Sequence, residues 1–446
     1  MTKKSKIRVR FAPSPTGLFH IGTARTALFN YLFAKKHKGD FILRIEDTDK
    51  QRSKKEFEKD ILNGLKWLEL KWDKIYYQSK RIKIYKQYLQ KLLDEGKAYV
   101  DEIIWFKNPH KKVIFNDLIR GKIEVDSSVL EDFSLAKNLD EPLYNFAAVI
   151  DDHEMQISHV IRGEDHITNT PKQILIYEAL GLNPPQFAHL PLILGPDRSK
   201  LSKRHGAVSL SDYKNQGYLP EALINFMVLL GWSPQSGISP QRGGNPHDEE
   251  ILSIKDLIQE FSIEKIQKGG AVFNLDKLNW FNSYYIKQKP VKELTKLCLS
   301  YLKQEKLIKN NFDKNKLEKI IKLEQGRINK LSEVGESTDF FFKKSEPSKD
   351  LLKWKDMQQR EIIASLDKSY LILCDIKSGD FGIEKLKQAL MKEAEKFGSG
   401  DRGKLLWPLR VALSGKEKSP SPFDIAEILG KEETLERIQK ARKLLK

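Results

Sequence analysis

Hydrophobic and polar positions follow two different periodicities along the first 180 residues, one typical of strands and one typical of helices. Residues 7–11 alternate basic and apolar side chains, and 41–45 form a short apolar run, so both segments predict strands. Between them, residues 21–37 carry Leu28, Leu32 and Phe33 at helical spacing. A strand, a glycine-bearing turn, a helix and a strand open a parallel α/β domain. Downstream we expect helices at 54–70, 80–95 and 171–180, a small β element at 113–125, and strands at 145–149 and 155–161 joined by a turn at Asp151 and Asp152.

The pattern changes after about residue 232. Residues 233–250 are rich in Ser, Pro, Gly and Gln and predict a loop or linker. The remainder is lysine-rich, with helical periodicity and few strand signals. Ser421 and Pro422 supply an N-cap and a proline at the first helical position, and Gly430 ends that helix.

Length and composition are those of a globular protein. The 446 residues suffice for two or three domains. No apolar run approaches the roughly eighteen residues of a membrane span, and no apolar stretch follows the basic N-terminus as in a signal peptide. Cys298 and Cys374 stand far apart among apolar neighbours, which favours buried free thiols over a disulfide or a metal pair. We therefore expect a cytoplasmic protein without a membrane partner.

The formal net charge is +17. An excess of this size attracts polyanions such as nucleic acid, through contacts that weaken as salt rises. A lysine-rich proteome, in which most lysines keep the surface soluble, is the alternative. Charge alone does not choose between them, so the motifs must decide.

Residues 12–23 lie between the first strand and the first helix and contain His20, Ile21 and Gly22. Free backbone N–H groups and the helix dipole favour a phosphate at such a position. Gly22 would let a nucleotide approach the backbone closely, and His20 would donate a hydrogen bond to an anionic oxygen. Taken alone, the same residues describe a turn with a helix-capping histidine.

A second motif, at residues 200–204, holds Lys200, Lys203 and Arg204 and follows Gly195 and Pro196. Three cations within five residues suit a mobile loop that closes over phosphates and stabilises charge developing at phosphorus. Taken alone, they equally describe a solvated basic loop.

Together these motifs resemble the His-Ile-Gly-His and Lys-Met-Ser-Lys-Ser signatures of class I aminoacyl-tRNA synthetases. Thr23 and Arg204 replace the last residue of each signature, and both replacements are familiar in the glutamyl and glutaminyl branch. The chain is identified as a member of the bacterial glutamyl-tRNA synthetase family through further similar segments at 8–17, 24–30, 44–49, 144–152, 159–166, 169–173, 188–191 and 408–415.

The resemblance implies an α/β fold: a Rossmann-like class I catalytic domain with a shortened insertion, followed by an all-α anticodon-binding half. Helical periodicity in that half favours the glutamyl family, since the usual glutaminyl enzymes carry β-barrels there. The expected divisions are the first catalytic half (1–98), the shortened acceptor-binding insertion (99–140), the second catalytic half (141–232), a helical stem-contact junction (233–325) and the helical anticodon-binding domain (326–446).

The implied activity is ATP-dependent formation of glutamyl-adenylate and transfer of glutamate to the 3′-terminal adenosine of tRNA(Glu). Arginine suits the substrate carboxylates because its planar fork binds them bidentately. Mg²⁺ would arrive with ATP and be held mainly by phosphates and water. By resemblance, the catalytic residues are His20, Lys200 and Lys203; the ATP-binding residues are Thr16, Gly17, His20, Gly22 and Lys203; and the glutamate-binding residues are Arg10, Ser14, Glu46, Tyr144 and Arg162.

Many bacterial members have a longer insertion with cysteine ligands for zinc. This chain has no cysteine there, so we predict no zinc site and no other protein-bound metal, and His166 beside Glu164 and Asp165 needs none. Three alternatives stay open: a non-discriminating enzyme that also charges tRNA(Gln) with glutamate, a catalytically silent tRNA-binding homologue, and a nucleotidyltransferase of related fold. By analogy we expect a monomer.

Overall fold

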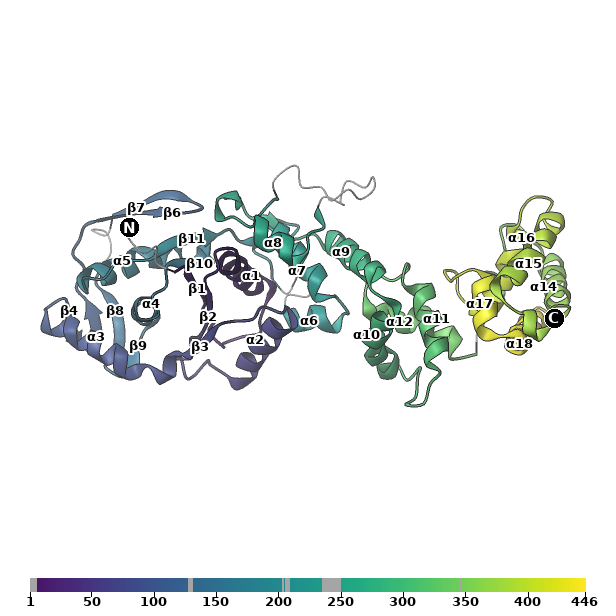
Figure 1. Ribbon diagram of the computed structural model, residues 1–446, viewed down its shortest axis with the longest axis horizontal. Helices are drawn as coiled ribbons and strands as arrows, with labels where there is room; N and C mark the ends of the chain where they lie inside the picture. The colour runs from purple at the N-terminus through teal and green to yellow at the C-terminus, as the bar shows by residue number, and fades with distance from the viewer. Residues whose placement is uncertain (1–5, 127–130, 203, 205–208, 235–249, 345) are drawn as a thin grey trace. The chain divides into compact units, whose positions relative to one another are not determined.

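The computed structural model describes residues 6–126, 131–202, 204, 209–234, 250–344 and 346–446 (Figure 1). The chain forms two compact units, 1–281 and 282–446, whose boundary falls within helix α9 (Leu275–Gln288). The loop predicted at 233–250 lies almost wholly outside the described residues. The finer division into five parts stays a prediction.

A seven-stranded sheet organises the first unit. All neighbouring strands pair in parallel except the last two, β6 and β7. The first strand, β1, lies between β2 and β10, so the strand order reverses beside it, and in open α/β sheets ligands bind at the carboxyl ends of strands near such a point. In spatial order the strands are β3 (Lys74–Tyr77), β2 (Asp40–Ile45), β1 (Arg8–Phe11), β10 (His159–Gly163), β11 (Gln186–Leu190), β6 (Lys112–Asp117) and β7 (Gly121–Asp126).

The central strands are apolar on both faces, as expected when helices cover a parallel sheet. In β2, Phe41, Ile42 and Leu43 are all buried. Arg44 and Glu46 are buried beside them, which is costly for charged groups unless they are paired. The helices of this unit are α1 (Ile21–Lys36), α2 (Lys55–Trp67), α3 (Ile82–Asp94), α4 (Tyr144–Glu154), α5 (Thr170–Ala179), α6 (Leu210–Asn215), α7 (Pro220–Leu229) and α8 (Ile254–Glu260).

Most of the predicted elements are confirmed. The helices expected at 21–37, 54–70, 80–95 and 171–180 are α1, α2, α3 and α5, with ends shifted by a few residues. The β element expected at 113–125 is the β6–β7 hairpin, which joins the main sheet where Asp117 pairs with Phe187 of β11. Residues 98–142 also supply a separate four-stranded sheet, made of β4 (Ala98–Asp101), β5 (Ile103–Phe106), β8 (Phe133–Asn138) and β9 (Glu141–Pro142).

Two expectations were wrong. Residues 145–149 are not a strand but part of helix α4, and Asp151 and Asp152 lie in its last turn instead of a hairpin turn. A short apolar run that is buried all round looks the same to periodicity in a helix and in a strand. Cys374 ends helix α14 (Gln359–Cys374) and is exposed, not buried, whereas Cys298 is buried as expected; both thiols are free.

The second unit is helical. Its apolar core includes Leu366, Leu390, Leu409 and Ile438. The predicted cap is confirmed, because the Ser421 side chain accepts a hydrogen bond from the backbone N–H of Asp424. The helices after α9 are α10 (Val291–Gln304), α11 (Lys314–Glu324), α12 (Val334–Thr338), α13 (Lys349–Leu352), α14 (Gln359–Cys374), α15 (Ile383–Phe397), α16 (Gly403–Ser414), α17 (Pro422–Leu429) and α18 (Lys431–Leu444). No helix among the described residues is long and apolar enough to cross a membrane.

Candidate active site

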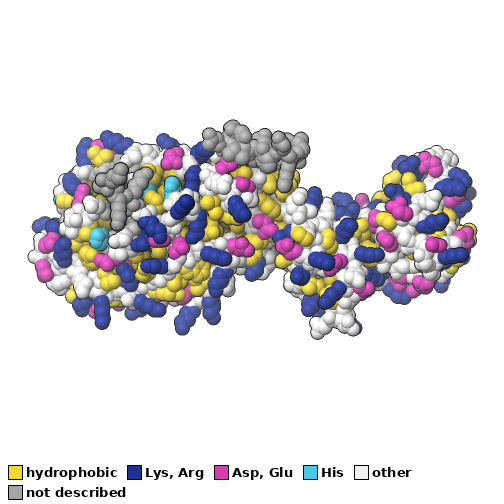
Figure 2. All heavy atoms as spheres, viewed as in Figure 1, with side chains coloured by type: hydrophobic (Ala, Val, Ile, Leu, Met, Phe, Trp, Pro, Cys, Tyr) yellow, Lys and Arg dark blue, Asp and Glu magenta, His cyan; other side chains and the backbone are white. Residues whose placement is uncertain are grey.

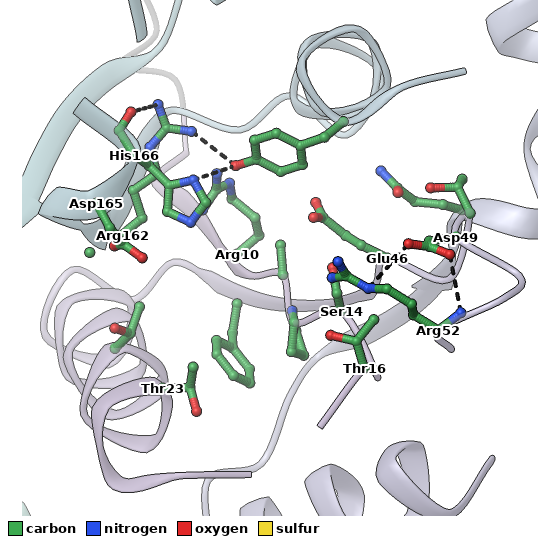
Figure 3. Close-up of a pocket in the computed structure, with 18 of the residues that line it drawn as sticks. Arg10, Ser14, Thr16, Thr23, Glu46, Asp49, Arg52, Arg162, Asp165 and His166 are labelled. Atoms are coloured by element: carbon green, nitrogen blue, oxygen red, sulfur yellow. Dashed lines mark hydrogen bonds and ion pairs between the residues drawn. The ribbon is translucent and has the colours of Figure 1, made fainter. Parts of the chain in front are cut away.

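A cavity of about 1050 Å³ opens at the carboxyl ends of β1, β2 and β10 (Figure 3). This is the size of a site for one or two small molecules. The fold gathers residues that are distant in sequence around it. The sequence-predicted residues that line it are Arg10, Ser14, Thr16, His20, Gly22, Glu46, Tyr144, Arg162 and Lys200.

Two predicted residues are not among those lining the cavity. Gly17 is exposed on the turn next to Thr16. Lys203 lies outside the described residues, although Lys200 and Leu201 of the same motif line the cavity. The phosphate role of Lys203 therefore stays a prediction.

His20 is the N-cap of helix α1. Its Nδ1 accepts a hydrogen bond from the backbone N–H of Thr23 at 3.3 Å, so a neutral ring carries its proton on Nε2. The surrounding protein, and then the ammonium of Lys200, lower the pKa of His20 below its ordinary value. A neutral His20 at pH 7 therefore presents an N–H donor beside the helix N-terminus, where anions are favoured. Helix capping and anion binding use different nitrogens and do not exclude each other.

Helix α2 holds the turn that carries His20. Asp60 of this helix accepts a hydrogen bond from the backbone N–H of Phe19 at 2.7 Å. One turn later, Gly64 leaves room for the Phe19 ring, since a Cβ at Gly64 would lie 2.5 Å from Cδ1 of Phe19. The position of His20 thus depends on a helix with no predicted role.

Arg162, at the end of β10, is a buried cation whose described hydrogen bonds all go to neutral groups. Its Nε donates to Nε2 of His189 at 3.1 Å, and its Nη2 donates to Oγ1 of Thr170 at 2.8 Å. Nη1 donates to the hydroxyl of Tyr144 at 3.3 Å, and Nη2 also faces the carbonyl of His166 at 3.4 Å. Burial lowers the pKa of Arg162, but a guanidinium stays charged. The cavity therefore contains a positive charge with no carboxylate partner among the described residues.

His166 and Tyr144 are neutral neighbours of this arginine. Burial, and then Arg162, lower the pKa of His166 to about 4. The ring is therefore neutral at pH 7. Since the Tyr144 hydroxyl accepts from Arg162, it can donate to Nδ1 of His166, 3.2 Å away.

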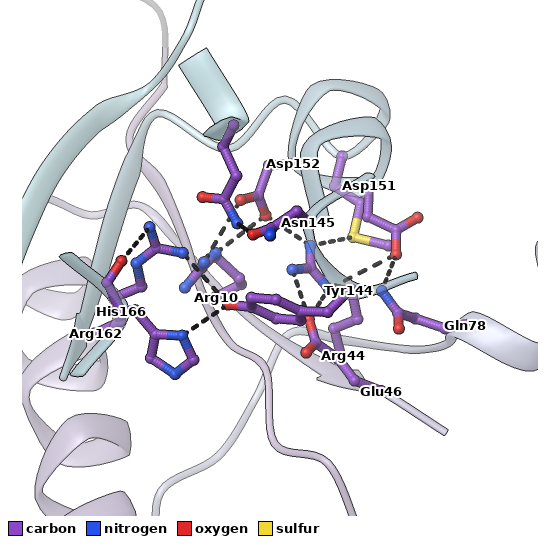
Figure 4. Close-up of polar contacts among 12 residues, drawn as sticks. Arg10, Arg44, Glu46, Gln78, Tyr144, Asn145, Asp151, Asp152, Arg162 and His166 are labelled. Atoms are coloured by element: carbon purple, nitrogen blue, oxygen red, sulfur yellow. Dashed lines mark hydrogen bonds and ion pairs between the residues drawn. The ribbon is translucent and has the colours of Figure 1, made fainter. Parts of the chain in front are cut away.

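Arg10 and Arg44, in contrast, have carboxylate partners (Figure 4). Both contact Oδ1 of Asp152, Arg10 through Nε at 3.0 Å and Arg44 through Nη1 at 2.6 Å. Burial raises the pKa of the Asp152 carboxyl, but Arg10 and Arg44 oppose this and the net shift is downward. Asp152 therefore stays ionised between two arginines.

Glu46 completes this network from the end of β2. Its Oε1 accepts from Nη2 of Arg44 at 3.0 Å and from Nε at 3.3 Å. Burial raises the pKa of Glu46 more than Arg44 and Arg10 lower it. A cation entering the cavity would lower the pKa of Glu46, so the carboxyl is suited to an ammonium group.

Asp151 anchors the far side of the network. Its carboxylate accepts from Arg81 at 2.6 Å, from Tyr85 at 2.8 Å and from Gln78 at 2.9 Å. Arg44 also pairs with it at 3.7 Å. These contacts fix the end of α4 against α3 and hold Asp152 in place.

Sequence reasoning missed Arg44, Asp152, His189 and Asp117 as parts of the site. The first had a visible signal, since an arginine within an otherwise apolar central strand must be paired. The partners themselves were not predictable, because Asp152 and Arg10 are 142 residues apart and Asp117 and His189 are 72 residues apart. Within the described part of the chain, no group of three or more His, Cys, Asp or Glu side chains could hold a metal ion.

Family comparisons cover most of the chain. The family described as tRNA synthetases class I (E and Q), catalytic domain, matches residues 6–104 and 102–280, in two pieces that meet at 102–104. A second family, the anticodon binding domain, matches residues 293–442.

Individual proteins are similar over the full length. Glutamate–tRNA ligase 2 of Thermoanaerobacter pseudethanolicus is 40% identical over an alignment of 484 positions that covers 98% of each chain. Glutamate–tRNA ligase 1 of Caldicellulosiruptor saccharolyticus is 41% identical, covering 97% of this chain and 98% of that one. The crystal structure of a glutamate tRNA ligase from Elizabethkingia meningosepticum, in complex with its amino acid, is 33% identical with a TM-score of 0.85, covering 99% of this chain and 100% of that one.

Proposed function

The chain belongs to the family of class I tRNA synthetases for glutamate and glutamine, and we propose that it is a glutamate–tRNA ligase that activates glutamate with ATP and transfers it to tRNA(Glu). The observation that carries the proposal is the buried, charge-uncompensated Arg162 in the cavity. A desolvated cation without a carboxylate partner is unfavourable until an anion binds to it. The amino-acid substrate must supply that anion.

Glutamate fits this distribution of charge. Arg162 and Arg10 would receive its carboxylates, and the cation-compatible Glu46 would receive its ammonium group, with hydrogen bonds from Ser14 and Tyr144. Glutamine carries an amide where glutamate carries its second carboxylate. It would leave one positive charge of the cavity unneutralised, which favours glutamate as the substrate.

ATP would bind at the other side of the cavity, at the N-terminus of α1. We propose that the free backbone N–H groups there, the Nε2–H of His20, and Lys200 with Lys203 hold its phosphates, with Thr16, Gly17 and Gly22 forming the turn against the nucleotide. The α-carboxylate of glutamate attacks the α-phosphorus in line, and pyrophosphate leaves. A ribose hydroxyl of the terminal adenosine of tRNA then attacks the carbonyl carbon, and AMP leaves. Neither step needs a protein nucleophile, so the chain acts by positioning and by stabilising charge.

Mg²⁺ would neutralise the phosphate charge of ATP. Because the described residues offer no cluster of ligands for it, ATP oxygens and water would hold the ion. We also propose that the protein carries no zinc, because its insertion contains no cysteine, and, from the resemblance, that it acts as a monomer.

The acceptor-binding insertion is proposed to be shortened. The catalytic family match divides at residues 102–104, within the segment predicted to be short. The alignment with the Thermoanaerobacter ligase has 484 positions, whereas this chain has 446 residues, so that relative contains residues without a counterpart here. The division of the family match supports a smaller surface for the acceptor end of tRNA, and the additional residues of the relative are compatible with it. The residues proposed to bind glutamate and ATP lie outside the predicted insertion at 99–140.

Charging assays test the proposal. We expect the purified protein, with ATP and Mg²⁺, to attach labelled glutamate to tRNA(Glu), with tRNA(Gln) in a parallel reaction. Charging of tRNA(Glu) alone identifies a discriminating ligase, and charging of both identifies the broader enzyme. Binding of ATP and tRNA without charging of either would identify a silent homologue and overturn the proposal.

A further inference from the structure

We infer that Asp117 and His189 are positioning residues for Arg162: they fix the orientation of its guanidinium while leaving its positive charge available to the substrate. The inference rests on the proposed function, because it takes Arg162 to be the receptor of a glutamate carboxylate. Neither residue lines the cavity, and both act through Arg162.

The arrangement begins with a firmly held carboxylate. Oδ1 of Asp117 accepts from the backbone N–H groups of Ile119 at 2.9 Å and Arg120 at 2.8 Å. Its other oxygen, Oδ2, lies 2.6 Å from Nδ1 of His189, and both side chains are fully buried. Burial alone raises the pKa of Asp117, but His189 and the backbone donors outweigh it and the net shift is downward. An ionised carboxylate can only accept, so Nδ1 of His189 must carry the proton.

That assignment determines the other ring nitrogen. Burial lowers the pKa of His189 more than Asp117 raises it, so the ring is neutral. With the proton on Nδ1, Nε2 has a free lone pair, which accepts from Nε of Arg162 at 3.1 Å. The hydroxyl of Thr170 lies 3.1 Å from the same nitrogen and also accepts from Nη2 of Arg162. The guanidinium is therefore held along one edge.

The choice of a neutral acceptor has a chemical consequence. Arg10 and Arg44 are oriented by Asp152, which also neutralises charge. His189 orients Arg162 through a hydrogen bond but adds no negative charge at the site. The full charge of Arg162 then remains for an incoming carboxylate. A substrate with an amide in that place would gain much less.

The same contacts join the pocket to the β6–β7 hairpin. Asp117 is the last residue of β6 and pairs with Phe187 of β11, two residues before His189. The hairpin turn therefore presents the carboxylate that sets the tautomer of His189. A hairpin from the shortened insertion thus contributes to the amino-acid site without touching it.

An isosteric substitution tests the inference. In Asp117→Asn, the amide N–H₂ can face Nδ1 of His189 and drive the proton to Nε2, where it would oppose the N–H of Arg162. We expect the KM for glutamate to rise about tenfold to a hundredfold, the cost of losing a hydrogen bond to a charged group. The KM for ATP should change little.

Two substitutions of His189 provide a matched pair. His189→Gln keeps an acceptor at the position of Nε2, which faces Arg162, whereas His189→Asn keeps only a donor at the position of Nδ1, which faces Asp117. We expect His189→Gln to retain a KM for glutamate near that of the unmodified protein and His189→Asn to resemble Asp117→Asn. Thermal unfolding of each variant measures how much stability is lost. A purely structural role would give the two His189 variants the same KM.

The outcomes separate the two proposals. If the unmodified protein charges tRNA(Glu) but Asp117→Asn keeps its KM for glutamate, the positioning role is overturned and the ligase assignment stands. Equal KM values for His189→Gln and His189→Asn overturn it as well, even if Asp117→Asn fails to fold. If the unmodified protein charges no tRNA with glutamate, the proposed function and this inference both fail.

Discussion

At the scale of single residues, the two arginines predicted to bind carboxylate differ in the charge of their partners. Arg10 contacts the ionised Asp152, whereas the described partners of Arg162 are neutral. Asp152 itself lies between two arginines, so it neutralises Arg10 only in part. Affinity for an anion should therefore depend more on Arg162 than on Arg10.

Removing the charge of Arg162 tests this ranking. We expect Arg162→Gln to raise the KM for glutamate by about thirtyfold or more, because truncating one member of a buried charge pair costs about 2–5 kcal/mol. Arg8→Gln is the control, since Arg8 lies on the same strand as Arg10 but pairs with Asp40 outside the cavity. A similar KM in Arg162→Gln and the unmodified protein would remove Arg162 from the amino-acid site.

The basic motif at residues 200–204 should affect kcat more than the affinity for glutamate. Lys203 is predicted to contact the phosphates in the transition state, so Lys203→Ala should lower kcat while leaving the KM for glutamate nearly unchanged. Steady-state pyrophosphate exchange measures both constants. An effect confined to the KM for glutamate would contradict the assignment.

We expect the stability of the second unit to depend on pH through Glu324. Its side chain is buried at the end of α11, Oε2 accepts from Arg327 at 3.2 Å, and Oε1 has no hydrogen-bond partner among the described residues. Burial raises the pKa of Glu324 to about 7. A carboxyl with a raised folded-state pKa binds its proton more tightly in the folded protein. Its stabilising contribution is therefore complete below the unfolded pKa of about 4.5 and is lost as pH rises through 7.

We expect the free energy of unfolding to fall by up to about 3 kcal/mol between pH 5 and pH 8 through this one group. In Glu324→Gln the group no longer titrates, so that part of the decrease should disappear. Urea unfolding followed by helical circular dichroism at the two pH values measures the difference. Glu318→Gln, a partly exposed position on the same helix, is the control. An equal pH dependence in Glu324→Gln and the unmodified protein would contradict the assignment.

At the scale of elements, helix α2 supports the turn that carries His20. The two residues of α2 that contact this turn, Asp60 and Gly64, do not themselves line the cavity. Gly64→Ala would normally favour a helix by about 1 kcal/mol. Here the new Cβ would lie 2.5 Å from the Phe19 ring, and overpacking of this kind costs about 1–3 kcal/mol. The clash should win, since the neighbouring Asp60 contact prevents Phe19 from moving freely.

We therefore expect Gly64→Ala to lower both the melting temperature and kcat, because a displaced Phe19 shifts His20. Asn63→Ala, an exposed position next to it on the same helix, gains helix propensity without the clash and serves as the control. Thermal unfolding and charging rates of the two variants decide the matter. A Gly64→Ala variant that is more stable and fully active would show that packing of Phe19 against Gly64 does not position the turn that carries His20.

The elements also show which parts of the fold can be predicted from the sequence alone. The strand–turn–helix opening and the capped helix at Ser421 follow from local spacing and were predicted correctly. Residues 145–149 were predicted wrongly because a buried helix and a buried strand share one apolar pattern. The placement of Asp117 beside His189 depends on the hairpin joining β11, a long-range pairing that no local pattern encodes. Arg10, Glu46 and Arg162 were found only through resemblance, not through their contacts.

At the scale of the whole molecule, the sequence carries a formal net charge of +17. Figure 2 shows Lys and Arg side chains over the visible face of each unit, with Asp and Glu among them. Such a distribution suits a long polyanion contacted at many points instead of a single phosphate. Contacts of this kind release counterions and are screened by salt.

Salt concentration should therefore affect the binding of tRNA and the binding of glutamate differently. Between about 50 and 200 mM KCl we expect the affinity for tRNA to fall by at least about tenfold, since each neutralised phosphate adds to the salt slope. The KM for glutamate should change much less, because Arg162 is buried and screened weakly by ions. Filter binding of tRNA and pyrophosphate exchange at saturating tRNA measure the two quantities in the same buffers. If the affinity for tRNA and the KM for glutamate depended equally steeply on salt concentration, the glutamate site would have to be as open to solvent as the tRNA-binding surface. That result would be incompatible with a buried Arg162.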